Sequence, residues 1–289
     1  MPLDYEMLMS LPPREVRQSH SARDTILYAL GVGAADDLDA NPASLKFLYE
    51  EGLQALPTMA AVAAYPGFWL KEPQYGLDWR RILHGEQSIT WLRPMPAGGD
   101  LSGVITIDAI VDKGAEKGAV LHSSRRIYAE DGDHIATVRQ ASVLRGDGGF
   151  GGGDPPPSDP RPKPPPRPAD YVHDQTTVRS QALLYRLSGD LNPLHVDPTV
   201  ARTAGFERPI LHGLATYGVV GRALLHGLCG GDPAALKRYD VRFSSPVYPG
   251  ETLRTEMWRV GAGAAVLRTT AVERGVRVLS DGYVEISND

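Results

Sequence analysis

A stretch of glycine and proline divides the sequence near its middle. Residues 146–168 contain fifteen Gly or Pro among twenty-three residues. Proline has no backbone N–H to donate, and a chain of this composition has little apolar surface to bury, so the stretch can join neither a sheet nor a core. The sequence therefore predicts two folded modules, residues 1–145 and 169–289, with a linker at 146–168.

The two halves repeat the same order of local patterns. The segment YALG at 28–31 corresponds to YRLSG at 185–189, and EGLQALPTMAAV at 51–62 corresponds to AGFERPILHGLA at 204–215. A period of this length is too long for a solenoid repeat. We interpret it as the duplication of one helix-plus-sheet unit, which places the chain in the α+β class.

Strands are predicted where β-branched and polar residues alternate, and the turns between them contain Gly and Asp. Such alternation is typical of an antiparallel sheet with one covered face. The segments with this pattern are 88–95, 101–114, 119–132 and 134–145 in the first half, and 243–261, 264–275 and 277–287 in the second.

Each half also predicts a central helix. In the first, Pro57 opens an Ala-rich buried helix that Pro66 and Gly67 stop. In the second, residues 211–228 form a longer apolar helix with several interior glycines. Each such glycine costs about 1 kcal/mol relative to Ala, so we expect close packing against a curved sheet to offset it.

Composition narrows the classes of partner. The net charge is −5 and the pI about 5.9, whereas binding to nucleic acid or to an anionic membrane requires a basic surface. Cys229 is the single cysteine, as in proteins of reducing compartments. Neither end of the chain has the pattern of a signal peptide or of a peroxisomal ending. We expect a cytoplasmic protein with no nucleic-acid or membrane partner.

The densest group of reactive side chains lies at 185–213, where Asp190, Asn192 and His195 surround one Asn-Pro turn. On a helix, residues five apart are about 140° out of phase and could not share a ligand. The residue before a proline is displaced from the helical region, so a bend at Asn192 can bring both side chains to one point. Nearby, Asp197 before Pro198 is predicted to cap a short helix.

Several chemistries fit this group less well than acid/base catalysis. A calcium loop fails, because positions that need a glycine and a terminal glutamate carry His195 and Ala201. A zinc site built from Asp190, His195 and His212 is a weaker alternative, since no paired helical histidines occur. A third interpretation also remains open, in which Asp190 and His195 only stabilise the turn by hydrogen bonding. A carboxylate beside an imidazole suits general acid/base catalysis.

The segment YRLSGDLNPLHVDPTVARTAGF, continuing into PILHGLATYG, resembles the signature of the (R)-specific enoyl-CoA hydratases, the type 2 or MaoC-like hydratases, in their two-module form. The likeness extends over nearly the whole chain, including LYALGVGA, LKFLYE and LHGEQS. It implies a double hot-dog fold: two modules, each a long central helix wrapped by an antiparallel sheet, joined as a pseudo-dimer.

The resemblance also implies roles for individual residues. Asp190 and His195 correspond to the catalytic pair, Asn192 and Glu50 to residues that support the site, and Gly213 to the donor of a backbone N–H to the thioester carbonyl. The order of reference pKa values favours Asp190 as the base and His195 as the proton donor. No metal and no cofactor are implied, because CoA is part of the substrate. The first half has no counterpart of the catalytic loop, so one site per chain is expected.

The function expected from this resemblance is reversible hydration of trans-2-enoyl-CoA to (3R)-3-hydroxyacyl-CoA, a hydro-lyase reaction of fatty-acid β-oxidation or a related acyl-CoA pathway. We also expect a homodimer. Two other functions stay open at this point: a hot-dog acyl-CoA thioesterase, and an acyl-CoA-binding subunit without catalytic activity.

Overall fold

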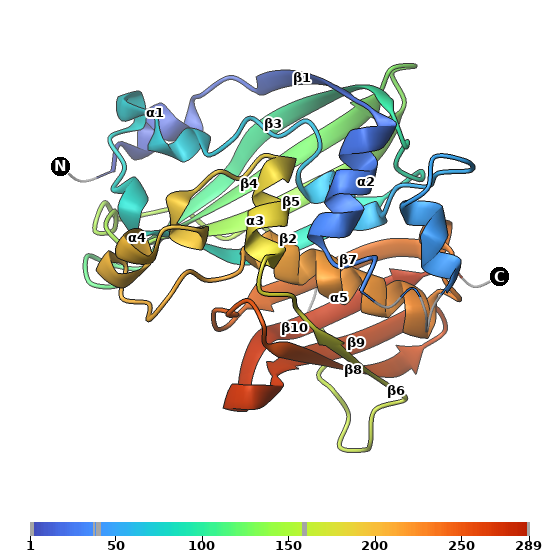
Figure 1. The fold of residues 1–289 in the computed structure, drawn as a ribbon. Helices are drawn as coiled ribbons and strands as arrows, with labels where there is room; N and C mark the ends of the chain where they lie inside the picture. Colours follow the sequence, from blue (N-terminus) through green and yellow to red (C-terminus); the bar gives the residue numbers. More distant parts are fainter. Residues whose placement is uncertain (1–2, 37, 39–41, 158–160, 288–289) are drawn as a thin grey trace.

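A computed structural model describes residues 3–36, 38, 42–157 and 161–287. Its ten strands form one antiparallel sheet (Figure 1). The first half contributes β1 (Arg14–His20), β2 (Ile82–Trp91), β3 (Gly99–Asp112), β4 (Ala119–Ala129) and β5 (His134–Leu144). The second half contributes β6 (Tyr171–Thr176), β7 (Leu236–Phe243), β8 (Thr252–Gly261), β9 (Ala264–Ala271) and β10 (Val276–Ile286).

The order of the strands reveals a duplication. Across the sheet it is β1-β3-β4-β5-β2-β7-β10-β9-β8-β6, so the second half repeats the first in reverse order. The two halves meet where β2 pairs with β7, from Glu86 opposite Arg242 to Thr90 opposite Arg238. The predicted α+β double hot-dog fold is confirmed, and the predicted linker falls between the end of β5 and the start of β6.

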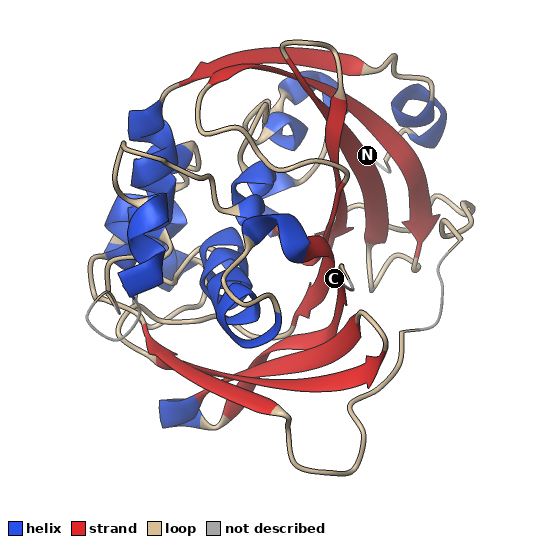
Figure 2. Ribbon diagram, turned by 90° about the vertical axis from the view of Figure 1, so that its right-hand side faces the viewer, coloured by secondary structure: helices blue, strands red, loops and turns tan. Residues whose placement is uncertain are grey.

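The main helices lie on the concave side of the sheet, which curves around them (Figure 2). The α-helices are α1 (Tyr5–Met9), α2 (Ala22–Gly31), α3 (Gln181–Tyr185), α4 (Pro198–Thr203) and α5 (Gly213–Leu228). The 3₁₀ segments are η1 (Pro42–Phe47), η2 (Pro57–Ala61), η3 (Trp69–Lys71), η4 (Pro73–Tyr75), η5 (Trp79–Arg81), η6 (Arg186–Ser188), η7 (Pro193–His195), η8 (Pro233–Ala235) and η9 (Val272–Arg274).

The central helix of the second module, α5, is close to its predicted bounds. The prediction of a central helix in the first module is wrong. After Pro57 the chain makes only the short 3₁₀ segment η2, and at Ala64 the backbone has a φ of 46°. A non-glycine residue in that left-handed region cannot continue a right-handed helix. The first module therefore places a compact turn where the second places α5.

The glycines of α5 allow the two modules to approach closely. A Cβ atom on Gly218 would lie 2.4 Å from Val32 Cγ1, and one on Gly221 would lie 2.4 Å from Thr58 Cγ2. Both contacts are with the first module, so the expected packing of these two glycines against a sheet is wrong. Gly227 does face the sheet, because its Cβ would meet Met257 of β8. Because α5 has no side chain at Gly218 and Gly221, Val32 and Thr58 of the first module can pack directly against its backbone.

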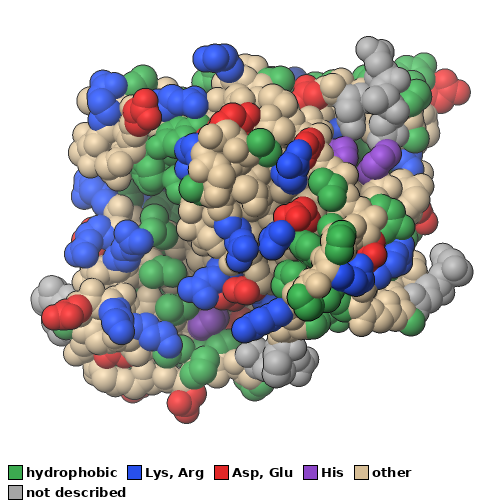
Figure 3. Space-filling model, turned by 90° about the horizontal axis from the view of Figure 1, so that it is seen from below, with side chains coloured by type: hydrophobic (Ala, Val, Ile, Leu, Met, Phe, Trp, Pro, Cys, Tyr) green, Lys and Arg blue, Asp and Glu red, His purple; other side chains and the backbone are tan. Residues whose placement is uncertain are grey.

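In the described part of the chain, no helix is both long enough and apolar enough to cross a membrane. On the face shown in Figure 3, Lys and Arg side chains lie among acidic and hydrophobic ones. The basic charge on that face is thus interspersed with acids, in keeping with the small negative net charge of the chain.

Candidate active site

The loop between α3 and α4 forms the turn that the Asn-Pro pair predicts. Asn192 is extended (φ −55°, ψ 122°), and its side-chain oxygen accepts a hydrogen bond from the Leu194 N–H at 3.1 Å, which caps η7. The Asn192 N–H donates to Asp190 Oδ1 at 3.2 Å. Asn192 therefore orients the Asp190 carboxylate through its backbone, and it fixes the turn that carries His195 through its side chain.

His195 presents one ring nitrogen to the site. Its Nδ1–H donates to the Ile210 carbonyl at 2.9 Å, which leaves Nε2 available for chemistry. Burial lowers the pKa of His195, and the hydrogen bond to Ile210 together with the charge of Asp190 offsets part of that effect. The lowered pKa makes the imidazolium form a stronger acid.

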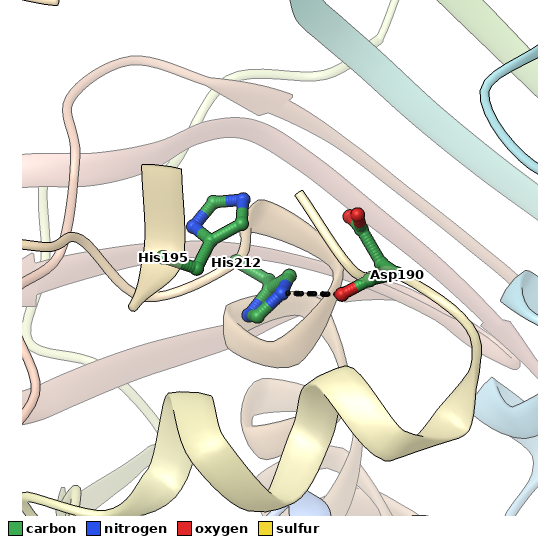
Figure 4. A group of neighbouring side chains, drawn as sticks. All are labelled: Asp190, His195 and His212. Atoms are coloured by element: carbon green, nitrogen blue, oxygen red, sulfur yellow. Dashed lines mark hydrogen bonds between the residues drawn. The ribbon is translucent and has the colours of Figure 1, made fainter. Parts of the chain in front are cut away.

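His212 supports both catalytic residues from below. Its Nε2–H donates to the backbone oxygen of Asp190 at 3.1 Å, and its ring stacks on that of His195 with centroids 3.7 Å apart. In Figure 4 the His195 ring and the Asp190 carboxylate lie on the same side of His212. Burial, followed by the neighbouring His195, lowers the pKa of His212 to about 3. This histidine is neutral, and its role as a support was not predicted from the sequence.

The zinc site considered from the sequence would use the same three side chains. Among the described residues, Asp190, His195 and His212 have potential ligand atoms within 4.8 Å of one another. The two imidazole rings are stacked, however, with an interplanar angle of only 28°. Imidazole binds a metal through a nitrogen lone pair that lies in the plane of the ring. In two stacked rings these lone pairs run nearly parallel, so they do not converge on one ion. The arrangement favours proton transfer over metal binding.

Gly213 begins α5, and the backbone N–H groups of a first helical turn have no partner within the helix. Gly213 is half-buried, and it directly follows His212, which contacts both Asp190 and His195. A Cβ atom at this position would lie 3.2 Å from the Phe243 ring, which packs against the helix start. An unpaired N–H at the positive end of a sixteen-residue helix suits a developing oxyanion.

Two other acids were singled out from the sequence, Asp197 and Glu50. Asp197 caps α4, because its Oδ1 accepts from Thr199 N at 2.7 Å, which confirms the predicted structural role. Glu50 is exposed, and it forms no hydrogen bond or ion pair with another described residue. The structure brings together Asp190, Asn192, His195 and Gly213, whereas Glu50 forms no hydrogen bond or ion pair with any of them.

The first module supplies one wall of the site. His84 on β2 packs its ring 4.8 Å from the Phe243 ring, beside Gly213. Burial lowers the pKa of His84 to about 4, although the charge of Asp190 raises it in part. Tyr65 also responds to Asp190, since burial raises its pKa to about 12 and that carboxylate adds to the increase. His84 also donates to Glu86 O at 3.1 Å, so it holds the strand start and lines the site.

Comparison with known proteins shows the family of the chain. Residues 161–281 match the model of the MaoC-like domain, and residues 19–146 match that of the MFE-2 hydratase 2 N-terminal domain. The chain belongs to the MaoC-like hydratase family. Enoyl-CoA hydratase 2, a peroxisomal protein of Arabidopsis thaliana, is 39% identical over 97% of this chain and 94% of its own.

Two further members of this hydratase family show the same extent of likeness. The 3-hydroxyacyl-thioester dehydratase Y of Mycobacterium tuberculosis is 44% identical over 91% of each chain. The crystal structure of a MaoC-like dehydratase from Phytophthora capsici superposes with a TM-score of 0.87 at 34% identity, covering 98% of this chain and 99% of that one. The resemblance inferred from the catalytic loop therefore holds over both modules.

Proposed function

We propose that the chain hydrates trans-2-enoyl-CoA reversibly to (3R)-3-hydroxyacyl-CoA, as a hydro-lyase of fatty-acid β-oxidation or a related acyl-CoA pathway. The observation that carries this proposal is the meeting of Asp190, the free Nε2 of His195 and the half-buried helix start at Gly213. The relatives named above are one hydratase and two dehydratases, and these names describe the two directions of one reaction.

In the proposed mechanism the thioester oxygen accepts the Gly213 N–H, and a water lies between Asp190 and His195. The pair starts as the Asp190 carboxylate and the His195 imidazolium, and Asp190 removes one proton from the water as its oxygen bonds to C3. The electron pair of the C2–C3 double bond then takes a proton from His195 Nε2 at C2, and the helix start stabilises the enolate oxygen formed on the way. Transfer of the proton from Asp190 to His195 restores the pair, so no cofactor beyond the CoA of the substrate is consumed.

The test is turnover of crotonyl-CoA with chiral analysis of the product and a parallel assay for free thiol. We expect loss of the conjugated absorbance, a (3R) product and no thiol release. D190N and H195Q should each lower kcat/KM by about 100-fold or more, as expected for loss of general acid/base catalysis. D197N, which removes an acid from the same segment, is the matched control. A (3S) product, or release of thiol, would contradict the proposal.

We also propose a homodimer located in the cytoplasm. The single cysteine supports a reducing compartment, although the Arabidopsis relative is named peroxisomal. Light scattering of the purified protein measures the first property, and cell fractionation measures the second.

A further inference from the structure

The seam between the modules depends on a short run of strand pairing. Among the described residues, β2 pairs with β7 at five positions that begin at Glu86 opposite Arg242, whereas β2 pairs with β5 of its own module at nine. His84 and Phe243, which line the site, lie directly beyond this run. A contact that holds the seam therefore also holds the frame of the site.

The outer face of the seam carries a buried acid. Along β7, Tyr239 and Val241 face the core, so Asp240 between them points to the convex side of the sheet. A charged residue on an outer face is ordinarily exposed, yet the Asp240 side chain is 0% exposed. A carboxylate shielded from water requires charged and hydrogen-bonding partners within the protein. A segment on the convex side must therefore cover Asp240.

Two partners of Asp240 come from the sheet itself. Ser88 Oγ of β2 donates to Asp240 Oδ1 at 2.5 Å, and this bond crosses the seam. Arg238 of β7 donates to Asp240 Oδ2 from its Nε at 2.9 Å. Arg238 is shared, however, because its Nη1 also lies 3.5 Å from Glu285 Oε1 on β10. One cation from the sheet thus serves two acids.

The third partner belongs to the linker, which runs along the side of the sheet that faces away from the helices (Figure 2). Arg161 Nε lies 3.5 Å from Asp240 Oδ2, and its Nη2 lies 4.0 Å from Glu86 Oε2. Its Nη1 donates to the Asp281 carbonyl at 3.2 Å. One guanidinium therefore reaches β7, β2 and β10, which are strands of both modules.

The acceptor on β10 is available because that strand is irregular at this point. Asp281 has a φ of 50°, and the register of β10 against β7 shifts between Ser280 and Tyr283. The register against β9 also shifts there, between Leu279 and Gly282. Residues at such irregularities drop out of the ladder of strand hydrogen bonds. The Asp281 carbonyl therefore accepts from the linker instead of from a neighbouring strand.

On these grounds we propose that the linker is a clamp on the module seam, in which Arg161 covers Asp240 and ties β2, β7 and β10 together from the convex face. The Gly and Pro residues keep the linker out of the sheet, but they leave the Arg161 side chain available for the acids of the seam. The clamp lies on the side of the sheet opposite the helices, so it supports the frame of the site without entering it.

The test measures backbone amide hydrogen exchange at the seam, in peptides that cover residues 86–90 and 238–242. In R161Q, exchange there should be faster by about threefold to tenfold, the effect of losing a charged contact that is partly exposed. R161K keeps the charge, but its single Nζ cannot reach three acceptors at once. Its seam should exchange at a rate between those of the native protein and R161Q.

Arg167 provides the matched control, because it belongs to the same linker and is likewise paired with an acid, Asp170, at 2.6 Å. Its other bond outside the linker goes to the Arg259 carbonyl on β8, within the second module. R167Q should therefore leave exchange at the seam at its native rate. Exchange at the seam that is unchanged in R161Q, or that rises equally in R167Q, would overturn the proposal.

A second measurement asks whether Arg161 acts through the buried carboxylate. D240N removes that charge, so R161Q should lower the thermal midpoint less in the D240N background than in the native one. An equal loss in both backgrounds would contradict the proposal. Neither measurement depends on turnover of a substrate, so both results stand apart from the test of the hydratase function.

Discussion

Replacement of His212 by Phe should make the stability of the protein less dependent on pH. The ring of His212 is 1% exposed, and burial lowers its pKa to about 3. In the unfolded chain a histidine has a pKa of about 6.5. Between these values the unfolded state binds a proton that the folded state does not, so folding loses stability as the pH falls below 6.5.

The magnitude follows from the size of the pKa shift. Each pH unit below 6.5 removes about 1.4 kcal/mol from the free energy of unfolding, which amounts to roughly 2 kcal/mol at pH 5. Phenylalanine keeps the stacking on His195 but loses the hydrogen bond to the Asp190 carbonyl, at a cost of about 1–2 kcal/mol at any pH. H212F should therefore be less stable than the native protein at pH 7.5 and about equally stable at pH 5.

Urea denaturation of both proteins at several values between pH 8 and pH 5 measures this difference. H226F is the comparison variant, because it removes an exposed histidine of the same helix and so shows what loss of a histidine that is not buried does to the same measurement. A stability difference between H212F and the native protein that stays constant over this range would refute the reasoning.

Three further substitutions, the last with a rescuing second change, test other parts of the structure. G213A places a methyl group 3.2 Å from the Phe243 ring, so kcat/KM for crotonyl-CoA should fall by about tenfold or more while the thermal midpoint shows a smaller relative change. E50Q should stay within a few-fold of native kcat/KM, since Glu50 is exposed, and a loss of 100-fold would show that it reaches the substrate. G221A should destabilise by about 1–3 kcal/mol through its contact with Thr58 Cγ2, and T58S, which removes that methyl group, should restore most of this in the double variant.

The parts of the fold that the sequence predicted are those encoded by local patterns. Period-two alternation located β3, β4 and β5, whose faces are covered on one side only. The apolar run ending at Leu228 located α5. The edge strands β1 and β6 and the seam strand β7 were not predicted, because each is short and owes its place to pairing with distant segments.

The catalytic loop was predictable because its geometry is local. Asn192 caps the turn it begins, and the groups it orients lie within three residues of it. The support from His212 was not predictable, since its hydrogen bond to the Asp190 carbonyl spans twenty-two residues and follows from the packing of α5. Glu50 was assigned to the site from the family resemblance alone, and no pattern in the sequence fixes its position.

The duplication explains why one module can lack catalytic residues and still be needed. The pairing of β2 with β7 places His84 of the first module against Phe243 of the second, so the site is built across the seam. The glycines of α5 then bring Val32 and Thr58 into contact with the catalytic helix. The second module therefore holds the reacting groups, while the first supplies one wall of their site.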